Sequence, residues 1–237
     1  MLKKLSLTML AALSLAGAAS AASAATTVIS VAGTSNPWLA GMPNGTSAGS
    51  GDTAPGESPV LVTGIGFAAG DVLRFSALGS TDHCSAGGCG LAGPEGDAAE
   101  GAFTHGALFG LSGLSAPIDS LIAVFLGSAQ PDGSAAPATL DFGSAAARDF
   151  ASLSPLLQQV FFIGDGLRND GVTLQDFVVP VGATRLFLGT MDGFGWFNNV
   201  GSLSVTVSTD DGGTPVPEPG TLALLALGTG LALRRRR

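Results

Sequence analysis

The sequence contains no tyrosine, two histidines and two cysteines among its 237 residues. No H-E-x-x-H or P-loop pattern occurs, so the common signatures of zinc proteases and nucleotide-binding enzymes are missing. Carboxylates are plentiful, but their spacing does not reveal a catalytic pair on opposite strands. We therefore expect a protein that is not an enzyme, and a hydrolase is the least favoured function.

Basic residues are also scarce, and most of them lie at the two ends of the chain. Ten Lys and Arg stand against eighteen Asp and Glu, and between Lys4 and Arg234 only four arginines remain. The middle of the chain is therefore strongly acidic. This excludes nucleic acid as a partner, because neutralising phosphates requires basic side chains. Many acids on Gly-rich loops suit hydration and divalent cations instead. For any single aspartate, solubility is the simpler explanation.

The N-terminal residues have the order of a secretory signal peptide. Two lysines come first, an uncharged apolar stretch covers residues 5–16, and small residues follow. Ala-Ser-Ala at 22–24 fits the A-x-A pattern and predicts cleavage between Ala24 and Ala25. We therefore predict a signal peptide over residues 1–24 and export of the chain. A buried N-terminal helix is the alternative, and this order of features argues against it.

The C-terminal end combines a short apolar stretch with a cluster of arginines. Residues 221–233 are apolar, but about 13 residues are fewer than the roughly 20 that a membrane-spanning helix needs. The Pro-Gly before the stretch cannot extend the helix. Arginines 234–237 can snorkel into the headgroups and hold the end of the chain on the cytoplasmic side. We predict a transient inner-membrane anchor; a tail that closes a soluble core would not carry four adjacent guanidinium groups.

A known sorting signal has the same three parts. Pro217, Glu218 and Pro219, the short apolar helix and the arginine cluster resemble the PEP-CTERM sorting signal of Gram-negative bacteria. The resemblance implies processing by an exosortase near the motif and delivery to the cell surface or the extracellular polymer matrix. It covers only this C-terminal segment, so it bears on where the protein goes and not on what the rest of the chain does.

Between the two ends, short runs of strand-forming residues alternate with Gly and Pro turns. In chain order they are residues 60–62, 72–76, 121–126, 160–163, 172–179, 185–188 and 203–207. Several alternate with period two, as Leu203, Val205 and Val207 do. The pattern predicts an all-β fold, an antiparallel β-sandwich or jelly roll. Residues 145–159 are the best candidate for one or two helical turns, and no fixed-period repeat supports a propeller or solenoid.

Composition divides the chain into five parts. We predict a signal peptide over 1–24, an irregular Gly/Ser/Pro-rich segment over 25–58, a β-sandwich ectodomain over 59–209, a linker over 210–216 and the sorting signal with its short transmembrane helix over 217–237. The part between the two ends is long enough for one domain with a sizeable core.

Cys84 and Cys89 are the only cysteines, and four residues separate them. An even, closely spaced pair in an exported chain predicts a disulfide that staples a flexible loop. Zinc binding is disfavoured, because two cysteines and the adjacent His83 supply too few ligands.

The segment 192–203, Asp-Gly-Phe-Gly-Trp-Phe-Asn-Asn-Val-Gly-Ser-Leu, carries the most chemical information. Calcium takes oxygens from carboxylates, amides and backbone carbonyls. Asp192 offers a charged oxygen, Asn198 and Asn199 offer neutral ones, and the glycines let the backbone curve around an ion. The same residue types are common in ordinary hairpin loops. Composition alone leaves both interpretations open.

The same segment resembles the calcium loop of the PA-I-type galactose-binding bacterial lectins, which are small β-sandwiches with a galactose-binding-domain-like fold. In the same order along the chain, Gly-Asp-Val at 70–72, Gly-Pro-Glu-Gly-Asp at 93–97 and His-Gly-Ala-Leu at 105–108 resemble further segments of that family. The resemblance covers residues 60–127 and 172–207, with an insertion between them.

The resemblance implies a calcium site. Asp192, Asn198 and Asn199 would be side-chain ligands, and the backbone carbonyl of Trp196 and one near His83 would complete the shell. The loop between the aspartate and the first asparagine is one residue shorter than in the lectins.

The resemblance also implies a sugar site. Asp97 and Glu100 fall where the family places sugar-contacting side chains, and Glu100 stands in place of a histidine. Trp196 and Phe194 either stack on the apolar face of a sugar or plug the end of the core. We therefore expect a calcium-dependent carbohydrate-binding module that engages a polysaccharide or glycan. The alternative is a structural matrix or biofilm protein without a sugar or metal site.

Overall fold

The computed structural model describes residues 24–209. The linker, the sorting signal with its apolar helix and all of the predicted signal peptide except Ala24 lie outside the described residues. The first strand begins at Thr26, directly after the predicted cleavage position, and the backbone N–H of Ala25 donates to Thr209 Oγ1 at 3.1 Å. Within residues 24–209, no helix is long and apolar enough to cross a membrane.

The first sheet is built from sequences that alternate between apolar and polar residues. Its spatial order is β1 (Thr26–Ala32), β14 (Val200–Thr209), β5 (Val72–Asp82), β12 (Asp176–Val178) and β10 (Ser152–Leu153). Val31 pairs with Leu203, so the inward apolar residues of neighbouring strands share one face. The pairing is antiparallel except between β10 and β12. Alternation of this kind turns one face of a sheet to the core and the other to solvent.

The second sheet is more apolar than the first. Its spatial order is β11 (Val160–Phe162), β8 (Leu121–Leu126), β13 (Arg185–Thr190) and β4 (Val60–Leu61). All six residues of β8, Leu-Ile-Ala-Val-Phe-Leu, are buried between β11 and β13. A continuous apolar run is typical of a strand that is covered on both faces.

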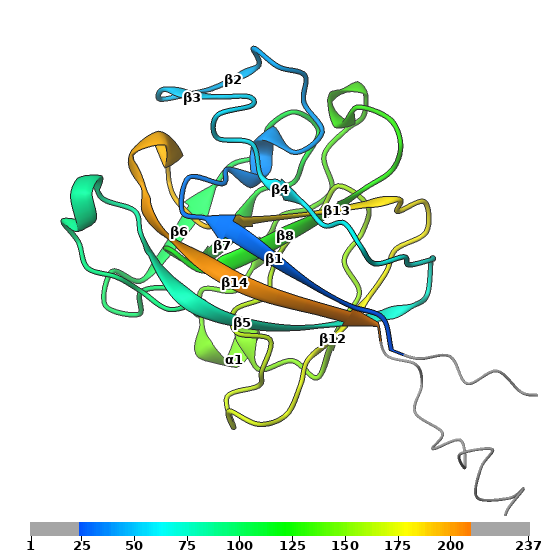
Figure 1. Cartoon of the computed structure of the whole chain (residues 1–237). Helices are drawn as coiled ribbons and strands as arrows, with labels where there is room; N and C mark the ends of the chain where they lie inside the picture. Colours follow the sequence, from blue (N-terminus) through cyan, green and yellow to red (C-terminus); the bar gives the residue numbers. More distant parts are fainter. Residues whose placement is uncertain (1–23, 210–237) are drawn as a thin grey trace, which may run out of the picture. The chain divides into compact units, whose positions relative to one another are not determined.

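The two sheets share one hydrophobic core and form two layers, with β1, β14 and β5 in one and β8 and β13 in the other (Figure 1). Aromatic residues fill much of this core. Phe75 meets Phe177 edge to face with ring centroids 5.0 Å apart, and Phe125 stacks on Phe161 at 5.4 Å. Pairs of this kind add about 0.5–1.5 kcal/mol to the stabilisation from burial.

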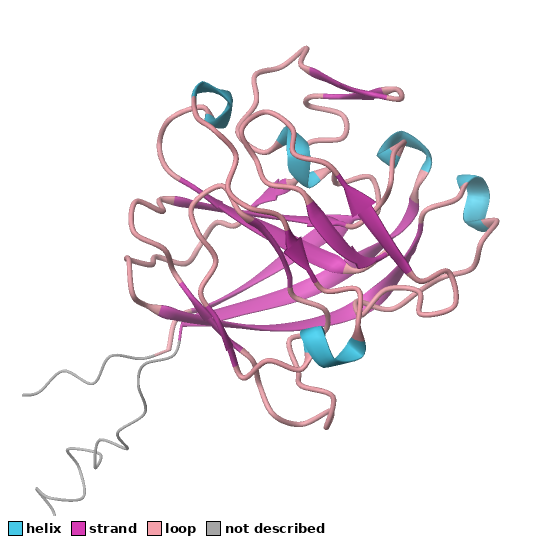
Figure 2. Cartoon of the chain, turned by 180° about the vertical axis from the view of Figure 1, so that it is seen from behind, coloured by secondary structure: helices cyan, strands magenta, loops and turns pink. Residues whose placement is uncertain are grey.

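Two small sheets and single helical turns complete the fold (Figure 2). The small sheets pair β2 (Ser47–Gly49) with β3 (Asp52–Thr53), and β7 (Leu114–Pro117) with both β6 (Ala102–His105) and β9 (Leu140–Asp141). Among the described residues the one α-helix is α1 (Ala145–Arg148), and the 3-10 turns are η1 (Pro37–Leu39), η2 (Ser85–Gly87), η3 (Pro131–Gly133) and η4 (Trp196–Asn198).

The all-β fold is confirmed, and each predicted strand overlaps an observed one. Two predictions differ from the structure. The segment 25–58 is not irregular throughout, because β1 pairs along its whole length with β14, and the sheet therefore begins before residue 59. Residues 145–159 contain only the single turn α1. The Asp149 carboxylate at its end accepts hydrogen bonds from Arg168, and the chain then enters β10.

Candidate functional site

The corner between β13 and β14 is held in place from two sides. Gly195, at φ 85°, lies in the left-handed conformation that glycine adopts without strain and precedes η4. On the core side, the indole N–H of Trp196 donates to the Thr190 carbonyl at 2.9 Å. On the other side, the backbone N–H of Phe197 donates to Asp52 Oδ1 at 2.9 Å. The segment that the sequence predicted as irregular, through β3, thus supports this loop.

Three oxygens of this loop are buried without a hydrogen-bond donor. Asp192 is 4% exposed, and its Oδ1 accepts the Phe194 N–H at 3.3 Å. Its Oδ2 makes no hydrogen bond of good geometry, although the Asn199 side chain approaches the carboxylate and acts to lower its pKa. The Oδ1 atoms of Asn198 and Asn199 are likewise buried without a partner. For Asn199 the orientation follows from its Nδ2, which donates to the Gly33 carbonyl at 3.2 Å. A buried polar atom left unpaired costs about 1–3 kcal/mol, so these oxygens make the loop the candidate site.

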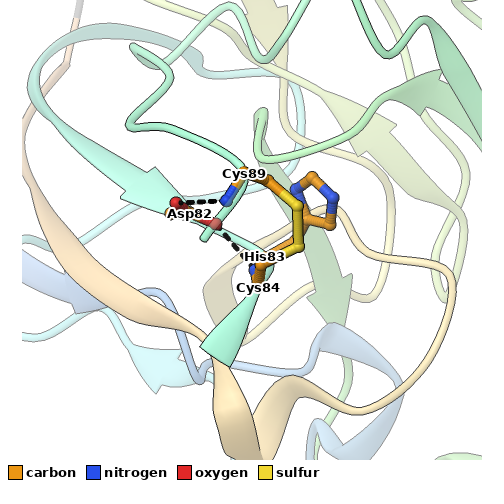
Figure 3. A group of neighbouring side chains, drawn as sticks. All are labelled: Asp82, His83, Cys84 and Cys89. Carbon is orange, nitrogen blue, oxygen red and sulfur yellow. Dashed lines mark hydrogen bonds between the residues drawn. A yellow bond between two sulfur atoms is a disulfide. The ribbon is translucent and has the colours of Figure 1, made fainter. Parts of the chain in front are cut away.

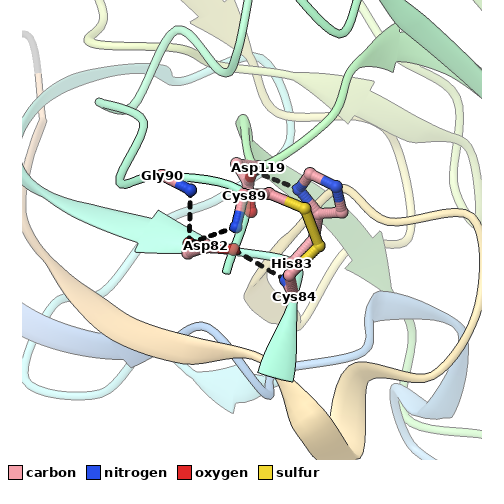
Figure 4. The surroundings of a disulfide bond; sticks show 6 residues. All are labelled: Asp82, His83, Cys84, Cys89, Gly90 and Asp119. Atoms are coloured by element: carbon pink, nitrogen blue, oxygen red, sulfur yellow. Dashed lines mark hydrogen bonds and ion pairs between the residues drawn. A yellow bond between two sulfur atoms is a disulfide. The ribbon is translucent and has the colours of Figure 1, made fainter. Parts of the chain in front are cut away.

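Asp119, which the sequence analysis missed, adds a fourth such oxygen. It lies between β7 and β8 and is 1% exposed. Its backbone N–H donates to the Met191 carbonyl at 2.8 Å, which places it beside Asp192. Its Oδ2 contacts His83 Nδ1 at 2.7 Å (Figure 4), whereas its Oδ1 is buried without a partner. In the sequence, nothing distinguishes this single aspartate, which is far from the loop along the chain. In the structure it stands out, because its φ of 67° lies in the left-handed region that residues other than glycine rarely adopt.

Burial governs how this group of side chains titrates. Burial, together with the nearby charges of Asp82 and Asp192, raises the pKa of Asp119 to about 6, against the lowering effect of the hydrogen bond and charge of His83. Burial also raises the pKa of Asp192. Burial of His83 acts to lower its pKa, but the hydrogen bond and charge of Asp119 outweigh this effect and the pKa is raised. A buried carboxylate whose ionisation a second carboxylate disfavours is an arrangement that a bound cation stabilises.

These shifts predict a pH dependence of stability in the metal-free protein. Because the folded pKa of Asp119 is about 6 instead of 3.8, the folded state binds more protons than the unfolded state between these values. The free energy of unfolding should therefore fall as the pH rises through this window. In Asp119→Asn this fall should be smaller. Urea titrations in EDTA across the window measure both slopes, and equal slopes would contradict the assignment.

Beside this cluster, Cys84 and Cys89 form the predicted disulfide. Asp82 holds the loop at both ends: Oδ1 accepts the Cys84 N–H and Oδ2 the Gly90 N–H, each at 2.7 Å (Figure 4). Figure 3 shows that Asp82, His83 and the two cysteines gather in one place, where their ligand atoms lie within 4.8 Å of one another. The sulfurs are bonded to each other and the carboxylate is occupied by backbone donors. The group is therefore a stapled loop and not a zinc site.

Residues of the disulfide loop and of the β13–β14 loop line one pocket of about 310 Å³. It is lined by His83, Cys84, Ser85, Phe103, Ile118, Asp192, Phe194 and Asn198. Two of the predicted metal ligands and His83 thus share one pocket with two phenylalanines. A second pocket, of about 240 Å³ around residues 126–134 and 157–158, has no titratable side chain in its lining.

Asp97 and Glu100, the predicted sugar contacts, are not among the residues that line this pocket. Asp97 Oδ1 accepts the backbone N–H of Ala99 at 2.7 Å and that of Glu100 at 3.3 Å. Asp97 therefore organises its own turn, and the structure assigns neither side chain a place beside the oxygen cluster.

Trp196 offers no ring face to a sugar, because it is 1% exposed. Its ring lies 5.7 Å from that of Trp38 and 5.7 Å from that of His105. Of the two alternatives, it therefore plugs the end of the core. Its neighbour in the loop, Phe194, is 72% exposed and lines the pocket.

These features define an acidic all-β domain with a pocket that Asp192 and Asn198 line together with His83 and two phenylalanines. At the C-terminus, residues 215–237 match a family model described as the PEP-CTERM protein-sorting motif. The match confirms the predicted sorting signal around Pro217, Glu218 and Pro219, and it implies export, processing by an exosortase and sorting to the cell surface. No curated protein matches the chain. The resemblance of the ectodomain to PA-I-type lectins therefore rests on its motifs alone.

Proposed function

We propose that this exported, surface-sorted protein is a calcium-dependent carbohydrate-binding module. The observation that supports the proposal is the group of four buried oxygens without donors, contributed by Asp119, Asp192, Asn198 and Asn199. Two charged and two neutral oxygens form a hard, all-oxygen set of the kind that Ca²⁺ prefers over softer metals.

Calcium takes six to eight oxygens, so side chains alone need not fill its shell. The backbone carbonyl of Trp196 accepts the Asn199 N–H at 3.1 Å and retains a second lone pair. This carbonyl and one near His83 are the further ligands that we propose. When bound, the ion supplies positive charge that balances the two carboxylates, and it accepts hydroxyl oxygens of a ligand. His83 orients the Asp119 carboxylate through its hydrogen bond.

The carbohydrate part of the proposal rests on the pocket beside these oxygens. A concave site with aromatic walls and a few convergent polar groups is typical of small-ligand binding. We include in the proposal the galactose-binding-domain-like jelly roll, a polysaccharide or glycan as partner, and transient anchoring in the inner membrane before exosortase processing.

A glycan array tests this function. The full chain, exported and purified, should bind glycans in millimolar calcium, and EDTA should remove the binding because the metal site loses its ion. A protein that binds glycans equally well in EDTA would show that the metal plays no part. If the protein binds calcium but no glycan, the carbohydrate part of the proposal is wrong and the protein is a metal-binding surface protein.

The alternative is a structural matrix protein whose loop only shapes the end of the domain. One observation favours it: Trp196, Asp52 and Asp82 already fix the two loops without any ligand. A thermal unfolding midpoint that calcium does not change, together with a silent glycan array, would support this alternative.

A further inference from the structure

We propose that Phe103 and Phe194 form an apolar clamp that selects an uncharged sugar ring. This inference rests on the proposed function, because it concerns the ligand of the same pocket. Phe103 lies on β6 and Phe194 in the loop after β13, and both line the pocket with Asp192.

The two rings are exposed in the pocket that Asp192 and Asn198 also line. Phe194 is 72% and Phe103 37% exposed, whereas phenylalanine is among the residues most often buried in folded proteins. Gly193 lets the Phe103 ring approach the loop, because a Cβ at this position would lie 2.8 Å from a Phe103 ring atom. The close fit of Phe103 on the loop backbone and the exposure of Phe194 leave an aromatic surface for a ligand to cover.

The charges around the pocket disfavour an acidic sugar. None of the residues that line it is a lysine or arginine. The four arginines of the described residues contact other groups: Arg74 pairs with Asp176, Arg168 with Asp149, and Arg148 and Arg185 donate to backbone carbonyls. The one ionisable base in the lining, His83, is already bonded to Asp119. A ligand carboxylate would therefore meet no guanidinium group, the side chain that binds carboxylates best.

The ion does not supply the missing positive charge. The carboxylates of Asp119 and Asp192 balance the two charges of Ca²⁺, so the loaded site has no net charge with which to attract a uronate. A neutral hexose matches both halves of the pocket: its hydroxyls face the ion and oxygen cluster, and its C–H face covers the phenylalanines. The negative face of an aromatic ring suits such a weakly positive C–H surface.

The test compares neutral sugars with their acidic counterparts. Calorimetry of the calcium-loaded full chain with methyl galactoside against galacturonate, and methyl glucoside against glucuronate, keeps the ring hydroxyls and changes only the charge. We expect binding of a neutral sugar and at least tenfold weaker binding of its uronate. Phe194→Ala and Phe103→Ala should each weaken the neutral sugar about tenfold, with calcium affinity unchanged.

Phe197→Ala is the matched control. Phe197 follows Trp196 in the same loop and is 53% exposed, but it is not part of the pocket lining, so its removal should leave sugar affinity unchanged. Tighter binding of the uronate, or full sugar affinity in Phe194→Ala, would overturn the clamp while calcium binding stands. Failure of the wild-type protein to bind calcium would instead overturn the proposed function, and the clamp with it.

Discussion

Asp192→Asn should greatly weaken calcium binding and leave the metal-free protein at least as stable as the wild type. The variant keeps the shape of the side chain but removes a charge that is 4% exposed and has one oxygen without a donor. Losing a charged ligand should weaken calcium on the order of a hundredfold or more, because affinity follows ligand charge. At calcium concentrations about 100 times the wild-type Kd, the wild type should gain about 2.7 kcal/mol of stability. The variant should gain almost none.

Urea titrations with calcium and with EDTA measure both halves of this prediction. Asp132→Asn is the matched control, since Asp132 is exposed on η3 and outside the pocket lining, and its response to calcium should equal that of the wild type. If Asp192→Asn loses stability in EDTA and keeps the full calcium gain, the carboxylate is a structural group of the loop and not a metal ligand.

Trp196→Ala should lower the free energy of unfolding by about 3–5 kcal/mol, the range for removing a buried aromatic side chain. The indole packs against the stacked rings of Trp38 and His105 and closes this end of the core. Since typical domains are stable by only 5–15 kcal/mol, this loss is large. Calcium affinity should fall with it, because the loop loses its anchor on the core side.

Trp196→Phe separates packing from hydrogen bonding. It keeps an aromatic ring in the core but leaves the Thr190 carbonyl without the indole N–H, which should cost about 1–3 kcal/mol. Denaturant unfolding should show a free energy of unfolding that falls from the wild type to Trp196→Phe and further to Trp196→Ala. If Trp196→Ala instead loses sugar binding at unchanged stability, the ring contacts the ligand and its assignment to the core is wrong.

The strands were predictable because their sequences repeat with the period of the sheet. Leu203, Val205 and Val207 alternate with polar residues, and they lie inward as the pattern requires. Strand β1 also alternates, with Ile29 and Val31 inward. It was missed because it directly follows the small residues of the predicted signal peptide and precedes a Gly- and Ser-rich stretch. Between these two segments, an alternation over only a few residues is hard to recognise. Its pairing with β14 joins the two ends of the domain, which local sequence does not encode.

The candidate site was predictable only where its residues are close in the chain. Asp192, Asn198 and Asn199 belong to one loop, so their spacing could suggest an ion. Asp119 comes from the β7–β8 corner, and only its backbone contact with Met191 brings it to the site. The two alternatives for Trp196 stayed open for a similar reason. Within one loop, sequence does not distinguish the aromatic side chain that enters the core from Phe194, which faces the pocket.

A crystal structure of the protein grown with calcium tests the central claim most directly. We expect one anomalous peak surrounded by the free oxygens of Asp119, Asp192, Asn198 and Asn199 at about 2.3–2.6 Å. Ordered waters on these four oxygens at millimolar calcium, with no peak among them, would contradict the account.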